Sequence, residues 1–226
     1  MKFHSFKFDF ALFFVIFFAF ILPAGMAKSQ NIVQTSITFQ NFPLNNLIYF
    51  LIAIFVYYVY KEKDDSLKSL HSISFRILLP AGFALSLVFF VSLIFKAISV
   101  VKFGDTGPSI ILPDRFISWL YAILTFGFAA FYEEVIYRFY FSEALSNLLY
   151  KTVAIENEKI EKIIIVLSEI TCLLFFAVAH SYMGKLSVTN AAIAHCIFRV
   201  LYKVTGNIYS SFTAHFIYNM ISLILL

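Results

Sequence analysis

Residues 77–101 read ILLPAGFALSLVFFVSLIFKAISVV and contain one charged side chain, Lys96. About 20 consecutive apolar residues are enough for an α-helix to cross the hydrocarbon core of a bilayer. This stretch therefore predicts a membrane-spanning helix. Six similar stretches lie on either side of it, at 8–27, 44–60, 116–150, 163–183, 187–203 and 208–225. We expect an all-α, polytopic integral membrane bundle of about seven transmembrane segments.

The composition of the chain argues against a soluble domain. Of its 226 residues, 61% are hydrophobic and 13% are charged, and the mean hydropathy is +0.87. Soluble domains have about 45–50% apolar and about 25% charged residues, and a water-exposed surface this rich in Phe and Tyr would be sticky. The net charge of +4 does not indicate nucleic-acid binding. Membrane lipid is the environment that this composition predicts.

Lys and Arg are unevenly divided between the two ends of the expected helices. With a cytoplasmic N-terminus and alternating helices, eleven of the seventeen fall on inner segments and five on outer ones, while Arg138 lies inside the membrane. Cytoplasmic loops of membrane proteins carry the excess of positive charge. We therefore expect the N-terminus inside and the C-terminus outside.

The first stretch, within residues 1–27, has two interpretations. Lys2 and Lys7 precede an apolar run that ends in small residues, Ala24-Gly25-Met26-Ala27, as in a signal peptide with its cleavage site. The run is longer than the usual ~7–15 residues of a signal peptide, and more membrane helices follow it. We expect a retained first helix.

The first group of charges inside the membrane lies in the segment FYEEVIYR at 131–138. Such charges are costly and mark functional sites by default. Glu134 and Arg138 are four residues apart, so they share a helix face and can pair. Glu133 lies about 100° away around an α-helix, where it can face a cavity and act as a general base. A structural ion pair that fixes helix packing and a proton or ion relay are the alternatives.

Two further polar positions lie in later apolar stretches. The segment FFAVAH at 175–180 ends in His180, and HFIYN at 215–219 places His215 and Asn219 four residues apart on one helix face. Taken alone, each of them is also consistent with ordinary hydrogen bonding between membrane helices.

Three other side chains in apolar stretches are interpreted more simply. His195 lies four residues before Arg199 and is expected to make a polar contact. Cys172 and Cys196 show neither metal-ligand spacing nor a disulfide framework, so we expect buried, inert thiols.

Together, one carboxylate, two imidazoles and one amide could supply what hydrolysis of a peptide bond requires. Three of these groups could bind Zn²⁺ and leave a coordination position for water. Without a metal, the glutamate would take a proton from water while His and Asn stabilise the oxyanion. The sequence leaves both mechanisms open.

The ordered motifs Glu133-Glu134-x-x-x-Arg138, Phe176-x-x-x-His180 and His215-x-x-x-Asn219 resemble those of the CPBP intramembrane proteases. This family, also called Abi, includes the type II CAAX prenyl proteases. The resemblance covers about residues 116–220, and it implies a catalytic core at 116–226, in the last four apolar stretches, behind variable membrane helices at 1–115.

The resemblance also implies roles for the motif residues. Glu133 would activate water, with Glu134 and Arg138 in support, and His180, His215 and Asn219 would complete the site. If a metal such as zinc is bound, Glu133, His180 and His215 would hold it. His195 departs from the family pattern, in which we expect a small residue.

These observations predict an intramembrane endopeptidase acting on a membrane-associated or membrane-anchored peptide or protein. The abundance of Phe, Ile, Asn and Tyr is typical of an AT-rich genome, which suggests a bacterial plasma membrane. The alternatives are a proton- or ion-coupled transporter and a non-catalytic membrane immunity or scaffold protein. Transporters often contain internal repeats, and none is evident here.

One geometric difficulty follows from strict alternation of the helices. It places His180 near the outer end of its helix and His215 nearer the inner end of the last one. Their convergence would require shifted helix ends or irregular backbone, which is tolerated at membrane depth where protein covers it.

Overall fold

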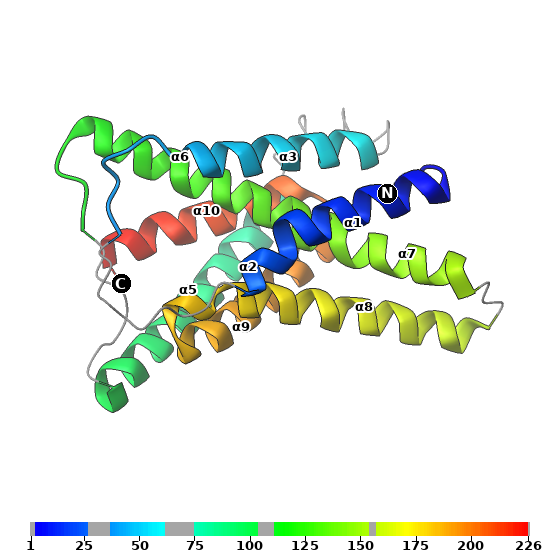
Figure 1. Ribbon diagram of the computed structural model, residues 1–226. Coiled ribbons are helices and arrows are strands. Elements are labelled where there is room, and N and C mark those ends of the chain that lie inside the picture. The colour runs from blue at the N-terminus through cyan, green and yellow to red at the C-terminus, as the bar shows by residue number, and fades with distance from the viewer. Residues whose placement is uncertain (1–2, 27–36, 62–74, 104–110, 154–156, 226) are drawn as a thin grey trace.

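The computed structural model describes residues 3–26, 37–61, 75–103, 111–153 and 157–225 (Figure 1). Within these ranges the chain forms seven helical rods, which confirms the all-α prediction. In order, their elements are α1 (Phe6–Ile16), η1 (Phe17–Ile21), α2 (Leu22–Met26), α3 (Leu44–Tyr60), α5 (Phe75–Phe103), α6 (Phe116–Glu133), η2 (Glu134–Tyr140), α7 (Phe141–Val153), α8 (Glu158–Ala179), η3 (Ser181–Met183), α9 (Lys185–Thr205) and α10 (Ile208–Leu225).

The described helices have the length and surface of membrane spans. Five are long and apolar enough to cross a bilayer, and α3 is a shorter apolar helix. Large apolar side chains stand on the outside of the bundle, among them Phe83, which is 72% exposed, and Phe116, which is 86% exposed. Such a surface is unfavourable in water but not in lipid. The chain is therefore an integral membrane protein.

The fifth rod begins earlier than its apolar stretch predicts. Helix α8 starts at Glu158 rather than near residue 163, because its first turn is stabilised by polar contacts. The side chain of Asn157 caps the helix by accepting a hydrogen bond from the Lys159 N–H at 2.9 Å. Lys162 and Glu158, one turn apart, form an ion pair at 2.8 Å. Hydropathy alone does not detect a polar helix end of this kind.

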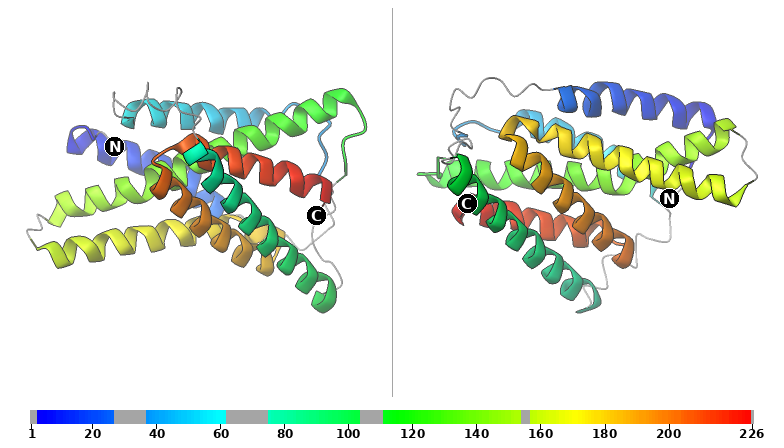
Figure 2. Two further views of the ribbon diagram at one scale, coloured as in Figure 1. Left: turned by 180° about the vertical axis from the view of Figure 1, so that it is seen from behind. Right: turned by 90° about the horizontal axis from the view of Figure 1, so that it is seen from below.

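The helices alternate in direction through the bundle. The starts of α1 and α8 and the ends of α3 and α7 lie at one end, on the right in Figure 1. The start of α6, the turn between α8 and α9, and the C-terminus lie at the opposite end, and the reverse view agrees (Figure 2). This alternation is the one expected from the sequence. Which end faces the cytoplasm remains a prediction from the Lys and Arg distribution.

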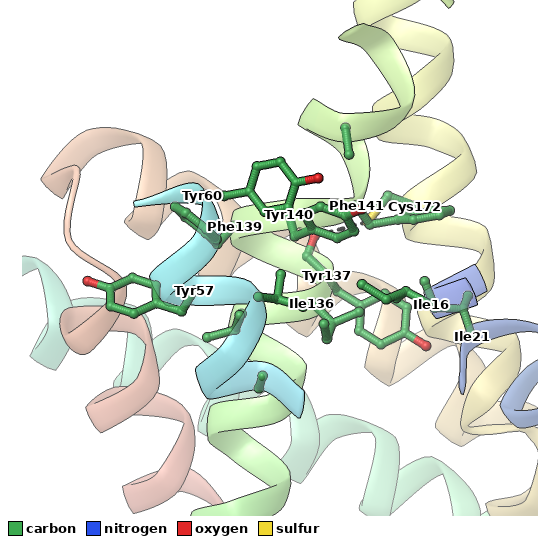
Figure 3. Close-up of a cluster of buried hydrophobic side chains, with 14 of the residues drawn as sticks. Ile16, Ile21, Tyr57, Tyr60, Ile136, Tyr137, Phe139, Tyr140, Phe141 and Cys172 are labelled. Atoms are coloured by element: carbon green, nitrogen blue, oxygen red, sulfur yellow. Dashed lines mark hydrogen bonds between the residues drawn. The ribbon is translucent and has the colours of Figure 1, made fainter. Parts of the chain in front are cut away.

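The core gathers aromatic and aliphatic side chains around the middle of the fourth rod (Figure 3). Tyr57 and Tyr60 of α3 pack there against Tyr140 and its neighbours in η2 and α7. Cys172 of α8 is buried in the same cluster, as predicted, whereas the same prediction for Cys196 of α9 is wrong, because that thiol is exposed. The segment that carries the predicted catalytic motif is therefore held from several sides.

The first rod is part of this core. Phe13 of α1 stacks on Phe141 with ring centroids 5.5 Å apart. The buried side chain of Asp9 accepts a hydrogen bond from the Tyr60 hydroxyl at 3.0 Å and lies 3.6 Å from the Lys151 ammonium. These contacts join α1 to α3 and α7. Ala27, at the end of the signal-like run, lies outside the described residues.

Candidate active site

The predicted catalytic segment changes helix type at Glu134. Helix α6 ends at Glu133, and the seven residues of η2 form a π-helix before α7 resumes α-helical geometry. The Phe141 N–H bonds to the Ile136 carbonyl, five residues back. Short π-helical insertions of this kind are rare and often occur at functional sites. Our expectation of a regular α-helix through this segment is therefore wrong, although the spacing of its polar residues still predicts their pairing.

Glu134 and Arg138 pair as the sequence predicts. Both side chains are fully buried, and Arg138 Nη1 lies 3.5 Å from Glu134 Oε1. The Arg138 guanidinium also lies over the ring of Phe176, 4.0 Å from its centroid. A cation on an aromatic face is stabilised by the ring quadrupole, more so where water is excluded. The pair places a compensated charge at the centre of the bundle.

The imidazole of His215 lies between two carboxylates. Its Nδ1 is 2.7 Å from Glu134 Oε1, and its Nε2 is 3.8 Å from Glu133 Oε2. Because a carboxylate oxygen accepts, Nδ1 carries the proton and donates to Glu134. That hydrogen bond orients the ring so that Nε2 faces Glu133. Phe198 stacks on the other side of the ring at 5.1 Å and limits its rotation.

The two glutamates differ in access. The Glu134 side chain is fully buried, whereas that of Glu133 is 22% exposed. Glu133 Oε2 and Glu134 Oε2 are both buried atoms with no hydrogen-bond partner among the described residues, so it is the exposure of the whole side chain that distinguishes the two. Glu133 is thus the more accessible of the two carboxylates, and Glu134 is the one that holds His215 and Arg138.

His180 reaches this cluster indirectly. It follows the last residue of α8, and its Nδ1 lies 2.8 Å from the Phe176 carbonyl oxygen. Its ring packs on Phe176 at 4.7 Å, on the same side chain that carries the Arg138 guanidinium. Among the described residues, no hydrogen bond or ion pair joins His180 to Glu133 or His215.

Asn219 lies one turn beyond His215 on α10 and is partly buried. In the described part of the chain it makes no hydrogen bond to the cluster. The structure therefore brings together Glu133, Glu134, Arg138 and His215, and leaves the convergence of His180 and Asn219 on them as a prediction.

His195 is more deeply placed than a surface polar contact would be. It is 2% exposed, and neither ring nitrogen has a hydrogen-bond partner among the described residues. Its ring packs 5.0 Å from that of Phe176. The polar contact that we expected for His195 is therefore not observed there.

One polar cluster beside the site was not predicted from the sequence. Arg199 is buried in α9 and contacts both Glu143 and Glu169. Both acids lie within predicted membrane stretches, so they required a cationic partner. That requirement was the signal that could have revealed Arg199.

The described residues do not form a metal centre in this arrangement. They contain no group of three or more His, Cys, Asp or Glu side chains placed to hold a metal ion. Of the three expected zinc ligands, Glu133 and His215 face each other, and His180 lies apart behind Phe176. The donor set of the described residues therefore does not fit zinc.

Comparison with known proteins agrees with the motifs. The family model described as "Type II CAAX prenyl endopeptidase Rce1-like" matches residues 115–221. No curated protein and no solved structure matches the chain. The matched region begins where we expected the catalytic core to begin, and it contains all three motifs. The resemblance predicted from the motifs is thus confirmed over residues 115–221, which are similar to the type II CAAX prenyl endopeptidase family.

Proposed function

We propose that this chain is an intramembrane endopeptidase in which Glu133 activates the attacking water. The observation that carries the proposal is the position of His215 between Glu134, at 2.7 Å, and Glu133, at 3.8 Å. The family match supports a peptidase in general. Glu133 is partly exposed, whereas Glu134 is fully buried and bonded to His215, and this difference supports Glu133 as the general base.

In the proposed reaction, water binds beside the Glu133 carboxylate and His215 Nε2. Glu133 takes one proton as the water oxygen bonds to the carbonyl carbon of the scissile peptide, and a tetrahedral oxyanion forms. Glu133 then gives that proton to the departing amine nitrogen as the carbon–nitrogen bond breaks. His180 and Asn219 are proposed to donate hydrogen bonds to the oxyanion, which is the role their donor groups suit.

Glu134 and Arg138 support this step without touching substrate. Glu134 fixes the orientation of His215, and Arg138 compensates the charge of Glu134 where no water can do so. A positioned group surrounded by fixed partners needs no reorganisation when the reaction occurs. Phe176 excludes water from the Arg138 guanidinium, and Phe198 excludes it from one face of the His215 ring.

We propose a membrane-associated peptide as the substrate. The apolar outer surface of the bundle keeps the site at the bilayer, so a substrate held in or on the membrane reaches it most readily. A prenylated CAAX tail is the substrate that the family description names, and a lipid-anchored or membrane-delivered bacterial peptide is the alternative that the composition favours.

The proposal is tested with purified protein in liposomes that contain a membrane-anchored reporter peptide. In water enriched in ¹⁸O, hydrolysis places the label in the new C-terminal carboxyl group, which mass spectrometry of the products detects. A pH-sensitive dye inside the same liposomes reports proton transport. Labelled product without a dye response supports the peptidase, whereas a dye response without cleavage of any anchored peptide supports the transporter.

A further inference from the structure

The π-helical segment η2 leaves a backbone carbonyl without its usual partner. In an α-helix the Phe141 N–H would bond to the Tyr137 carbonyl, four residues back. Here the Phe141 N–H bonds to Ile136 instead. A buried carbonyl that loses its partner is costly unless another donor replaces it. The sulfhydryl of Cys172, on α8, donates to the Tyr137 carbonyl oxygen at 3.0 Å (Figure 3).

The next carbonyl of η2 receives a second side chain. Arg199, on α9, donates from Nη1 to the backbone oxygen of Arg138. Its Nη2 donates to the Ser142 hydroxyl at 2.7 Å and to Glu143 at 3.0 Å, and its Nε donates to Glu169 at 3.0 Å. The planar guanidinium suits such a set, because its five N–H groups point in fixed directions.

These contacts tie three helices to the backbone behind the site. Arg199 belongs to α9, Glu169 to α8, and Ser142 and Glu143 to α7. The side chain of Arg138 points to Glu134, while its backbone oxygen is held by Arg199. Any shift of η2 back toward α-helical geometry would move Arg138 and Glu134 together.

We infer that Arg199 is a positioning residue for the proposed peptidase, and that Cys172 assists it. Together they hold η2 in π-helical form, so that Glu133 and Glu134, on either side of the helix transition, both face His215. Among the described residues, Arg199 makes no hydrogen bond or ion pair with Glu133, Glu134 or His215. It acts on the site through the backbone, and this inference rests on the proposed function of that site.

Lys203 provides a matched control for Arg199. It lies one turn further along α9 and contacts the same two acids, Glu143 and, at 4.0 Å, Glu169. It is half exposed, and in the described part of the chain it makes no hydrogen bond to the backbone of η2. Loss of Lys203 therefore removes a cation from the same cluster without releasing η2.

The experiment compares Arg199→Lys, Arg199→Gln and Lys203→Gln in the full-length protein, with kcat and KM measured on the anchored reporter. Arg199→Lys keeps a positive charge beside Glu143 and Glu169 but loses the guanidinium N–H that donates to the Arg138 backbone oxygen. We expect kcat to fall on the order of 10–100-fold with KM unchanged, because small misplacements of catalytic groups have effects of this size. Lys203→Gln should stay within about twofold, as expected for a half-exposed ion pair.

A second readout does not depend on cleavage. Protein labelled with ¹⁵N-histidine reports the ring nitrogens of His215 by NMR, and His215→Gln assigns the signal. We expect the Nδ1 signal to move in Arg199→Lys and in Cys172→Ala, and to stay in place in Lys203→Gln and in Cys172→Ser, which keeps a donor. A shifted signal in a protein that cleaves nothing would retain the positioning role and overturn the proposed function.

The inference on Arg199 is overturned by either of two results. The first is an Arg199→Lys protein with wild-type kcat and an unmoved His215 signal. The second is an equal loss of kcat in Arg199→Lys and Lys203→Gln, which would assign the effect to the charge of the cluster rather than to the backbone contact.

Discussion

Nδ1 of His215 lies 2.7 Å from Oε1 of Glu134, and this contact joins the last helix of the bundle to the widened turn of the fourth. It links residues that are 81 positions apart in the sequence. Its consequence is an imidazole whose other nitrogen faces Glu133. The second of the three sequence motifs, Phe176-x-x-x-His180, contacts this group of side chains through Phe176, whose ring packs against the Arg138 guanidinium.

Glu134→Gln is expected to weaken both the fold and the activity. The amide keeps the shape of the carboxylate but leaves Arg138 as an uncompensated buried charge, at a cost of about 3–5 kcal/mol in the free energy of unfolding. Unfolding of the purified variant in detergent, followed by tryptophan fluorescence or by heat, measures the loss. Glu158→Gln, in an ion pair on the surface of α8, is the control and should change stability by less than about 1 kcal/mol. An unchanged stability of Glu134→Gln would mean that Arg138 is satisfied by other groups.

Asp9→Ala is expected to loosen the first rod without altering the chemistry. The substitution leaves the Tyr60 hydroxyl and the Lys151 ammonium without their buried partner, and an unsatisfied buried group costs about 1–3 kcal/mol. The melting temperature should fall, while kcat of the protein that remains folded should not. Tyr60→Phe removes one of these contacts and should have a smaller effect. A loss of kcat at unchanged stability would place α1 in the active site rather than in its support.

His180→Ala and Asn219→Ala test whether the remaining motif residues belong to the site. If each donates to the oxyanion, kcat should fall by about 10²–10³ with little change in melting temperature, as for loss of an oxyanion donor. Asn190→Ala serves as the matched control, because its amide bonds to Ser92 on a neighbouring helix rather than facing the glutamates. Wild-type kcat in His180→Ala would remove that residue from the site and leave Phe176 as the functional part of its motif.

The sequence predicts the helices and the first motif for separate physical reasons. Apolar length sets where the rods lie, so α3 and α10 begin and end close to the expected residues. The spacing of Glu134 and Arg138 predicts their pairing because four residues bring side chains together on one face. Neither apolar length nor the spacing of charged residues specifies the backbone hydrogen bonds. The same sequence is therefore compatible with an α-helix and with the π-helix that the structure shows.

Relations between helices are harder to predict. Whether His180 reaches His215 depends on how α8 and α10 pack, which no local pattern specifies. Arg199 is one of seventeen Lys and Arg residues in the sequence, and its pairing with Glu169 depends on how α8 and α9 pack. An acidic residue inside an apolar stretch therefore predicts a cationic partner, which can lie on another helix far away in the sequence.

The replacement Glu133→Gln tests the central claim most directly, because Gln keeps the size and hydrogen-bonding shape of the side chain and removes the base. Cleavage of the anchored reporter in liposomes should fall by about 10²–10⁴ in kcat, with a melting temperature like that of the wild type, while the control Glu158→Gln cleaves normally. A Glu133→Gln protein that folds and cleaves at the wild-type rate would contradict the account, because Glu134, the other carboxylate beside His215 in the described cluster, is fully buried and holds that ring.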